Sequence, residues 1–319
     1  MSTQTLSTLW SSTSAVNAFQ WVNTISAALT ALGFVKTTDT GQLDLTGGTV
    51  PYPGAFVANT RYVIGYEIRK LALAGKPTIY VRVDYFNHSC FTNATCCYPS
   101  MDFTMGSGTD GAGNITTLKN AYICRVQPPS STNSAASTPN NATSCPIYMA
   151  SDGASYFTMV VDPAGIAPGG NYTVSPLAFT IERTRDLATG AYDGTGVVLW
   201  DVTNGSAAIT AGTSIQAYIN FTRGMTGSAT YLPGENNGNL FTSSQIDGPL
   251  KLFPISVQIP DIKRAGIAGF EYYAGEIGNG LTFTATVEGT VRTFMAMGTR
   301  CNGRTDATSL NYRLAMRWE

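Results

Sequence analysis

The sequence predicts a mainly β protein of the α+β class. We expect antiparallel sheets in a sandwich-like or jelly-roll-like arrangement, with one N-terminal amphipathic helix packed on a sheet. Two observations predict this class. Only one stretch, near the N-terminus, has hydrophobic residues at helical spacing, whereas many later stretches alternate between apolar and polar residues, as half-buried strands do. Charged residues form only 12% of the chain, and Gly, Ser and Thr are abundant, which suits short strands joined by turns.

The helix is expected to begin after Ser14, a suitable N-cap, and to end at Gly33, where a glycine commonly follows the last helical turn. Asp39 then lies in a short polar segment with a glycine two residues later, so we interpret it as a turn residue and not as a catalytic acid. The apolar stripe of the helix, with spacings of three and four residues, consists of Phe19, Val22, Ile25, Leu29 and Leu32.

Strands are expected through most of the remaining chain. In the first of them, Ile64, Tyr66 and Ile68 recur at every second position and are expected to share one face. A hairpin loop at 72–77 should join it to the next strand. The expected strands are 62–71, 78–85, 101–105, 121–126, 156–161, 178–182, 197–202, 215–221, 254–259, 281–287, 291–297 and 310–318.

The chain is expected to divide into three parts. Residues 1–13 form an N-terminal arm, residues 14–150 form a helix-plus-sheet domain, and residues 151–319 form a β-rich domain. Within the second part, residues 86–150 are interpreted as a cysteine-rich insertion. It contains a low-complexity polar loop at 127–144 that we expect to be exposed.

The N-terminal arm is rich in Ser and Thr and shows no clear helical or strand pattern. Its few large apolar residues are the ones that could dock it on a partner. We therefore predict an assembly arm whose contacts are Leu6, Leu9 and Trp10.

The cysteines allow three interpretations. His88, Cys90, Cys96 and Cys97 could supply four zinc ligands, but two of them are adjacent and the usual loop of two to four residues is missing, so no metal is assigned. A disulfide between Cys124 and Cys145 would close the polar loop and stabilise the fold by ~3 kcal/mol in the chain-entropy model. Free buried thiols are the third interpretation.

No catalytic or cofactor-binding motif is found. His88 is the single histidine, which excludes metal sites that need two histidines, and no serine lies in a Gly-x-Ser-x-Gly elbow. Two pairs of acids, Glu182 with Asp186 and Glu271 with Glu276, are interpreted as surface carboxylates. We expect no catalytic residues and no cofactor.

Charge also limits the partners. The 19 basic residues are scattered among 20 acidic ones, which argues against nucleic-acid binding. No apolar run is long enough for a transmembrane helix, and the first residues lack the features of a secretory signal, so we expect folding in a cytoplasm. A surface with so little charge is expected to be covered by copies of the chain or by other proteins.

Two stretches carry a resemblance to known proteins. The first runs from Phe19 to Tyr85 and contains the helix, the turn at Thr38–Gln42 and the alternating strand that ends the stretch; the glycine-rich segment Gly106–Gly113 belongs with it. The second runs from Pro249 to Met297 and includes Lys263-Arg264-Ala-Gly-Ile. Together they resemble virion structural proteins of tailed bacteriophages, which are encoded among tail and baseplate genes.

The resemblance implies a non-enzymatic component of the virion in the tail, baseplate or collar. Such a protein folds in the host cytoplasm and then assembles with copies of itself and with other virion proteins. The alternative is a receptor-binding fibre or knob whose exposed loops contact the host cell surface. A tail-spike polysaccharide depolymerase is the third possibility, but the repeats of a β-helix are not found in this sequence.

Overall fold

The computed structural model describes most of the chain in separate segments, and the structural statements below concern these segments. They are residues 2–9, 14–55, 57, 60–89, 97–116, 124–126, 144–161, 177–185, 192–202, 216–220, 225–228, 230–231, 251–258, 264–274, 280–287, 289–296 and 313–319. Within them, no helix is long and apolar enough to cross a membrane.

The predicted helix is present as α1, Ala15–Ala31. The backbone N–H of Asn17 donates to the Ser14 hydroxyl at 3.1 Å, which confirms the predicted N-cap. Gly33 has a φ of 92°, a left-handed conformation that suits the glycine after a helix end. The predicted stripe faces the core, although Phe19 is only half-buried, while Trp21 from outside the stripe is buried as well.

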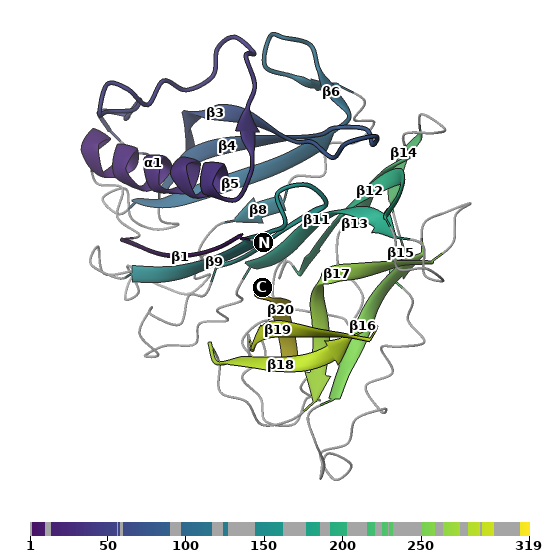
Figure 1. Ribbon diagram of the computed structural model, residues 1–319. Helices are drawn as coiled ribbons and strands as arrows, with labels where there is room; N and C mark the ends of the chain where they lie inside the picture. Colours follow the sequence, from purple (N-terminus) through teal and green to yellow (C-terminus); the bar gives the residue numbers. More distant parts are fainter. Residues whose placement is uncertain are drawn as a thin grey trace.

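A five-stranded antiparallel sheet lies next to the helix (Figure 1). Its order is β2-β3-β4-β5-β8. Strand β4 continues four residues beyond the predicted end at Tyr85 and pairs over ten residues with β5. The five strands are β2 Val35–Lys36, β3 Arg61–Leu71, β4 Ile79–Ser89, β5 Cys97–Gly106 and β8 Cys124–Val126.

The seven-stranded sheet is also antiparallel and has the order β1-β9-β10-β11-β12-β13-β14. From β9 onward, neighbours in the sheet follow one another in the chain, which is a meander, so a jelly-roll arrangement is not confirmed. The strands are β1 Ser2–Leu9, β9 Ser144–Ser151, β10 Tyr156–Val161, β11 Leu177–Arg185, β12 Tyr192–Val202, β13 Gln216–Asn220 and β14 Met225–Ser228.

The six-stranded sheet has the order β15-β16-β17-β20-β19-β18 and is antiparallel throughout. A short two-stranded ribbon, β6 with β7, lies beside the five-stranded sheet (β6 in Figure 1). The strands are β6 Gly108–Thr109, β7 Ile115–Thr116, β15 Thr230–Tyr231, β16 Lys251–Gln258, β17 Arg264–Ala274, β18 Thr282–Val287, β19 Thr290–Ala296 and β20 Arg313–Arg317.

The seven-stranded sheet is the middle layer of the molecule (Figure 1). On one face, the ring of Phe179 lies 4.7 Å from that of Phe103 in the five-stranded sheet. On the other face, Tyr148 meets Trp318 at 6.0 Å, beside the six-stranded sheet. Successive residues of a strand point to opposite faces, and the middle layer therefore uses both faces to bury side chains.

The main hydrophobic core is enclosed by α1, the five-stranded sheet and the first face of the seven-stranded sheet. It is rich in aromatic rings: Phe34 meets Phe157 edge-on at 5.0 Å, and Trp21 meets Tyr85 at 5.6 Å. Each large apolar side chain buried in this way stabilises the fold by about 1.5–3 kcal/mol. The described chain is thus mainly β, with antiparallel sheets and a single helix near its N-terminus, as the sequence predicts.

Two parts of the predicted organisation do not coincide with the sheets of the structure. The proposed boundary at residue 150 lies inside β9, in the sheet that also contains β1 and β10. The segment 86–150, interpreted as an insertion, contributes the end of β4 and all of β5 to one sheet and most of β9 to another. The division into domains stays a prediction.

The prediction that Ile64, Tyr66 and Ile68 share one face of β3 is wrong. A register shift between Val63 and Gly65 marks a β-bulge, which changes the face that later residues occupy. Glu67 consequently faces α1, to which it is hydrogen-bonded, whereas Tyr66 points away and donates to the Thr40 carbonyl at 2.9 Å.

Candidate functional site

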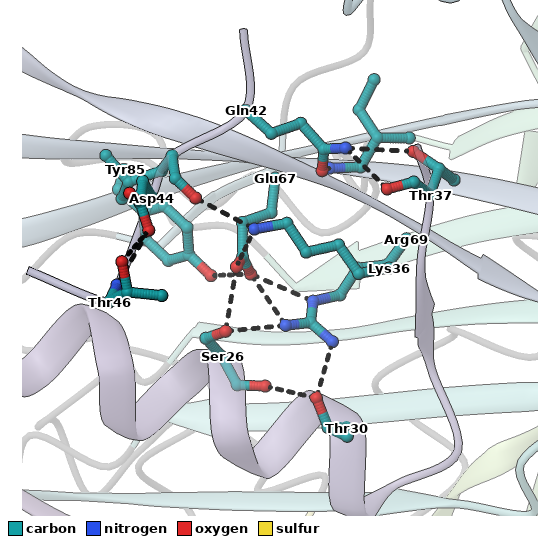
Figure 2. Close-up of polar contacts among 12 residues, drawn as sticks. Ser26, Thr30, Lys36, Thr37, Gln42, Asp44, Thr46, Glu67, Arg69 and Tyr85 are labelled. Atoms are coloured by element: carbon teal, nitrogen blue, oxygen red, sulfur yellow. Dashed lines mark hydrogen bonds and ion pairs between the residues drawn. The ribbon is translucent and has the colours of Figure 1, made fainter. Parts of the chain in front are cut away.

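A group of polar side chains, several of them buried, lies between α1 and the five-stranded sheet (Figure 2). We call it the charged cluster. It comprises Ser26 and Thr30 of α1, Lys36 of β2, Glu67 and Arg69 of β3, and Tyr85 of β4.

Glu67 is the centre of the charged cluster and has no exposed surface. Its Oε1 accepts from the Ser26 hydroxyl at 2.9 Å and lies 3.2 Å from the Lys36 ammonium. Its Oε2 accepts from Arg69 Nη2 at 2.9 Å and Nε at 3.0 Å, and from the Tyr85 hydroxyl at 3.2 Å. Both carboxylate oxygens are therefore bound by several donors, which a buried carboxylate needs to offset its lost hydration.

Arg69 is also buried, with 2% of its surface exposed, and links the sheet to the helix. Its Nη2 donates to the Ser26 hydroxyl at 2.7 Å and its Nη1 to the Thr30 hydroxyl at 2.9 Å. Thr30 in turn donates to the Ser26 carbonyl one turn earlier in the helix, at 3.1 Å. The guanidinium fork thus binds one strand carboxylate and two helix hydroxyls, which fixes how α1 lies on β3.

Burial affects Tyr85 strongly. Desolvation, together with the neighbouring Glu67 carboxylate, raises the pKa of the Tyr85 phenol well above its usual value of 10.0. The phenol is consequently a neutral hydrogen-bond donor to Glu67 at ordinary pH.

One side of the charged cluster is closed by the segment after β2. The Lys36 ammonium, whose side chain is 38% exposed, donates to the Leu43 carbonyl at 2.9 Å as well as meeting Glu67. The Gln42 side chain donates to the Thr37 carbonyl at 2.9 Å and accepts from the Ile68 N–H at 2.7 Å. These contacts tie the segment to the edge of β3.

The chemistry open to the charged cluster is limited. The Ser26 hydroxyl donates to Glu67, but the oxygens of this carboxylate are also bound by Arg69, Lys36 and Tyr85, so Glu67 is poorly suited to take a proton from Ser26 as a general base. A catalytic acid or base needs a position from which it can reach a substrate. In this arrangement the buried donors and acceptors are directed at one another, which is the geometry of a helix-to-sheet clamp.

A second charged pair is formed by adjacent residues of β11, the central strand of the middle layer. Arg183 faces the five-stranded sheet and donates to the carbonyls of Pro77 at 2.6 Å, Ala154 at 3.1 Å and Leu71 at 3.3 Å. Two of these carbonyls flank the hairpin loop between β3 and β4. Arg183 therefore fastens that hairpin to the middle layer.

Glu182 faces the six-stranded sheet and is 1% exposed, so its interpretation as a surface carboxylate is wrong. Its Oε1 accepts from the Thr180 hydroxyl at 2.8 Å and from the backbone N–H of Gly269 in β17 at 2.9 Å. A Cβ atom on Gly269 would lie 2.0 Å from the Thr158 Cγ2 atom. The glycine therefore allows β17 to approach the middle layer closely enough for this hydrogen bond.

Two arginines on the outer face of the five-stranded sheet repeat one arrangement. The guanidinium of Arg61 lies 3.8 Å from the centre of the Phe86 ring, and that of Arg82 lies 4.0 Å from the centre of the Tyr66 ring. Each also binds a carboxylate through two of its nitrogens. The carboxylates are those of Asp102 for Arg61 and Asp84 for Arg82.

Asp39 lies in the predicted turn, where Gly41 has a φ of 76°. Desolvation by itself would raise the pKa of Asp39, but hydrogen bonds from the hydroxyls of Thr37 and Thr109 outweigh it, and the pKa lies below the usual 3.8. The ionised carboxylate is thus held by turn hydrogen bonds, in keeping with a structural role.

The zinc candidates are only partly placed. His88 lies in β4, not in the loop-like setting that the sequence indicates, and Cys97 begins β5 as the partner of Ser89. Cys90 and Cys96 lie outside the described residues. In the segments that the structure covers, no group of three or more His, Cys, Asp or Glu side chains is arranged to hold a metal ion.

The disulfide and arm candidates are placed by their backbones. Cys124 begins β8 in the five-stranded sheet, and Cys145 lies in β9 of the seven-stranded sheet; their side chains fall outside the described part, so the disulfide stays a prediction. Leu6 is half-buried against the main core. The Leu9 side chain and Trp10 also fall outside the described part.

No family model, curated protein or solved structure matches this chain.

Proposed function

We propose that this chain is a non-enzymatic structural component of a tailed-bacteriophage virion, in the tail, baseplate or collar. It acts by assembling with copies of itself and with other virion proteins. The observation that carries the proposal is the use of buried charge: Glu67, Arg69, Glu182 and Arg183 bind groups of neighbouring layers. Strong polar contacts of this kind specify one relative position of the layers, which an assembling subunit needs.

The surface and the resemblance add support. The outer-face arginines, Arg61 and Arg82, bind carboxylates of their own sheet, so this face presents little unbalanced charge to solvent. The whole chain carries a formal net charge of −1. Weak charge favours association, because little electrostatic repulsion keeps copies apart. The first of the two stretches that resemble phage proteins, 19–85, includes every residue of the charged cluster, from α1 and the three strands β2, β3 and β4.

The test uses the full chain. Its mass in solution should be measured by light scattering over a wide concentration range, and purified particles of the phage that encodes it should be examined by quantitative mass spectrometry. We expect a defined homo-oligomer and a fixed number of copies per particle. A chain that stays monomeric at every concentration and is missing from washed particles would refute the proposal.

The receptor-binding role remains the alternative. The loop that suggests it, at 127–144, lies almost entirely outside the described residues. Deleting this loop in the phage and measuring adsorption to host cells separates the two functions, because only a receptor-binding module loses adsorption while particles still assemble.

A further inference from the structure

The N-terminal strand β1 occupies one end of the seven-stranded sheet. It pairs antiparallel with β9 along its whole length, from Ser2 opposite Ser151 to Leu9 opposite Ser144. Among the described strands, β9 is its single neighbour in the sheet. The predicted assembly arm is therefore, over residues 2–9, an edge strand docked on its own chain (Figure 1).

Few described side chains of β1 hold it in place. Ser2 and Thr5 are exposed, Thr3 and Gln4 are half-buried, and Leu6 alone of these five packs against the main core. An edge strand with one neighbouring strand, whose described side chains bury little apolar surface, belongs to the parts of a fold that open locally at low free energy.

If β1 detached, β9 would become an edge strand that needs another strand as a partner. The backbone groups of β9 that pair with β1 would lose their partners, and an unpaired edge is a template for another strand. Behind this edge, Ile147 and Met149 belong to the main core, and the residue of β1 opposite Met149 is Gln4. Leu6 stands directly opposite Ile147 in the register of β1 and β9.

We propose that β1 exchanges between copies of this chain, so that β1 of one copy pairs with β9 of another in the same register. The occupant follows from the structure, because β1 is the sequence that already fits this edge. The contacts between β1 and β9 in the closed subunit are remade in the exchanged one, so protein concentration shifts the balance between the two forms. The inference rests on the self-assembly in the proposed function and specifies its interface.

The experiment uses two single-cysteine variants of the full chain, Thr3→Cys and Ala150→Cys. These positions lie directly opposite each other in β1 and β9. The two variants are mixed, incubated at a concentration where oligomers form, and oxidised. A disulfide between positions 3 and 150 in the mixture joins two different chains, and peptide mass spectrometry distinguishes it from bonds of the six native cysteines.

The control is the double variant, which carries Thr3→Cys and Ala150→Cys on one chain. It should form the bond between positions 3 and 150 under the same conditions, because the pairing within one chain brings the two positions together. We expect the bond in the mixture as well. If the double variant forms it and the mixture does not, strand exchange is overturned.

Oligomeric state separates this inference from the function on which it rests. Oligomers that form in the mixture without the bond would leave self-assembly standing and assign it to another surface. Variants and native chain that stay monomeric at every concentration would overturn the self-assembly and the strand exchange together.

Discussion

Two pairs of buried charges in this molecule are built in opposite ways. Glu67 and Arg69 are two residues apart on β3, share one face of the strand and bind each other at 2.9 Å. Glu182 and Arg183 are adjacent on β11 and point to opposite faces, where they bind groups of the six-stranded and five-stranded sheets. The difference follows from the two-residue period of a strand.

The spacing decides what each pair does for the fold. Charges two residues apart neutralise each other locally, and the pair as a whole is bound by helix hydroxyls. Charges one residue apart cannot meet, so each has to be solvated by groups of the layer that it faces. The first arrangement clamps a helix to a strand, whereas the second makes the central strand of the middle layer a connector between three layers.

The largest expected effect comes from breaking the first pair. Arg69→Met leaves the buried Glu67 carboxylate without its closest countercharge and removes the guanidinium donor from the Ser26 and Thr30 hydroxyls. We expect a loss of about 3–5 kcal/mol in the free energy of unfolding. Urea titration monitored by tryptophan fluorescence measures it, because Trp21 packs against Tyr85 beside the charged cluster.

The matched control removes both charges with Glu67→Leu and Arg69→Met together. An apolar pair of similar volume is often tolerated where a single unpaired charge is not, so the double variant should be more stable than Arg69→Met alone. If the double variant is less stable than Arg69→Met, the two charges do more for the fold than neutralise each other. The contrast drawn with the pair on β11 would then be contradicted.

The second prediction breaks the connector on β11. Arg183→Met leaves the carbonyls of Leu71, Pro77 and Ala154 without the guanidinium. A single hydrogen bond to a charged group contributes about 1.5–3 kcal/mol, and contributions within one network do not add. We expect a destabilisation of about 2–4 kcal/mol, with faster amide hydrogen exchange at the turn between β3 and β4. Arg292→Met is the control, since Arg292 pairs with Glu319 at the surface, and should lose about 1 kcal/mol or less. Equal losses in the free energy of unfolding for Arg183→Met and Arg292→Met would contradict the role of Arg183 in holding the β3–β4 hairpin to the middle layer.

The third prediction tests the contact on the other face of β11. Gly269→Ala places a methyl group 2.0 Å from Thr158 Cγ2, and this side chain lies in a buried strand that cannot move freely. Overpacking of this kind destabilises a protein by about 1–3 kcal/mol. Combining it with Thr158→Ser, which removes that methyl group, should restore part of the loss. Gly47→Ala is the control because its new methyl group meets no atom within 4 Å; a loss as large at Gly47 would contradict the packing argument.

Much of the fold follows from local patterns in the sequence. The N-cap, the helix stripe and the hairpin loop at 72–77 rest on residues that act on their immediate neighbours, and the strand predicted at 156–161 matches β10. The bulge at Val63–Gly65 in β3 escapes the alternation rule, because an extra residue reverses the faces that follow it. The face of Glu67 could therefore not be predicted, although Gly65, with a φ of 156°, is a residue that often marks a bulge.

The burial of Glu182 and Arg183 on β11 could not be predicted for a different reason. An acid beside a base in a strand resembles a half-exposed surface, and only the layers on both sides of β11 reveal that Glu182 and Arg183 are buried. Strand β17 was missed since its glycines weaken strand propensity, and Gly269 is needed for a contact with Thr158 that is distant in sequence. The clamp and the connector thus depend on tertiary contacts that no local pattern encodes.

The smallest expected effect comes from Tyr85 of the charged cluster, and it should depend on pH. Tyr85→Phe removes one donor to Glu67 and should destabilise the protein by about 1 kcal/mol at neutral pH.

The raised pKa of Tyr85 means that above pH 10 the phenol ionises in the unfolded chain while it stays neutral in the folded one. Its contribution is therefore fully present below pH 10 and is lost as the pH rises toward the folded-state pKa. The advantage of the native chain over Tyr85→Phe should shrink by up to about 1.4 kcal/mol per pH unit in this range. Urea titrations of both proteins between about pH 9 and pH 11 measure it, and a constant difference across that range would show that Tyr85 is not held neutral beside Glu67.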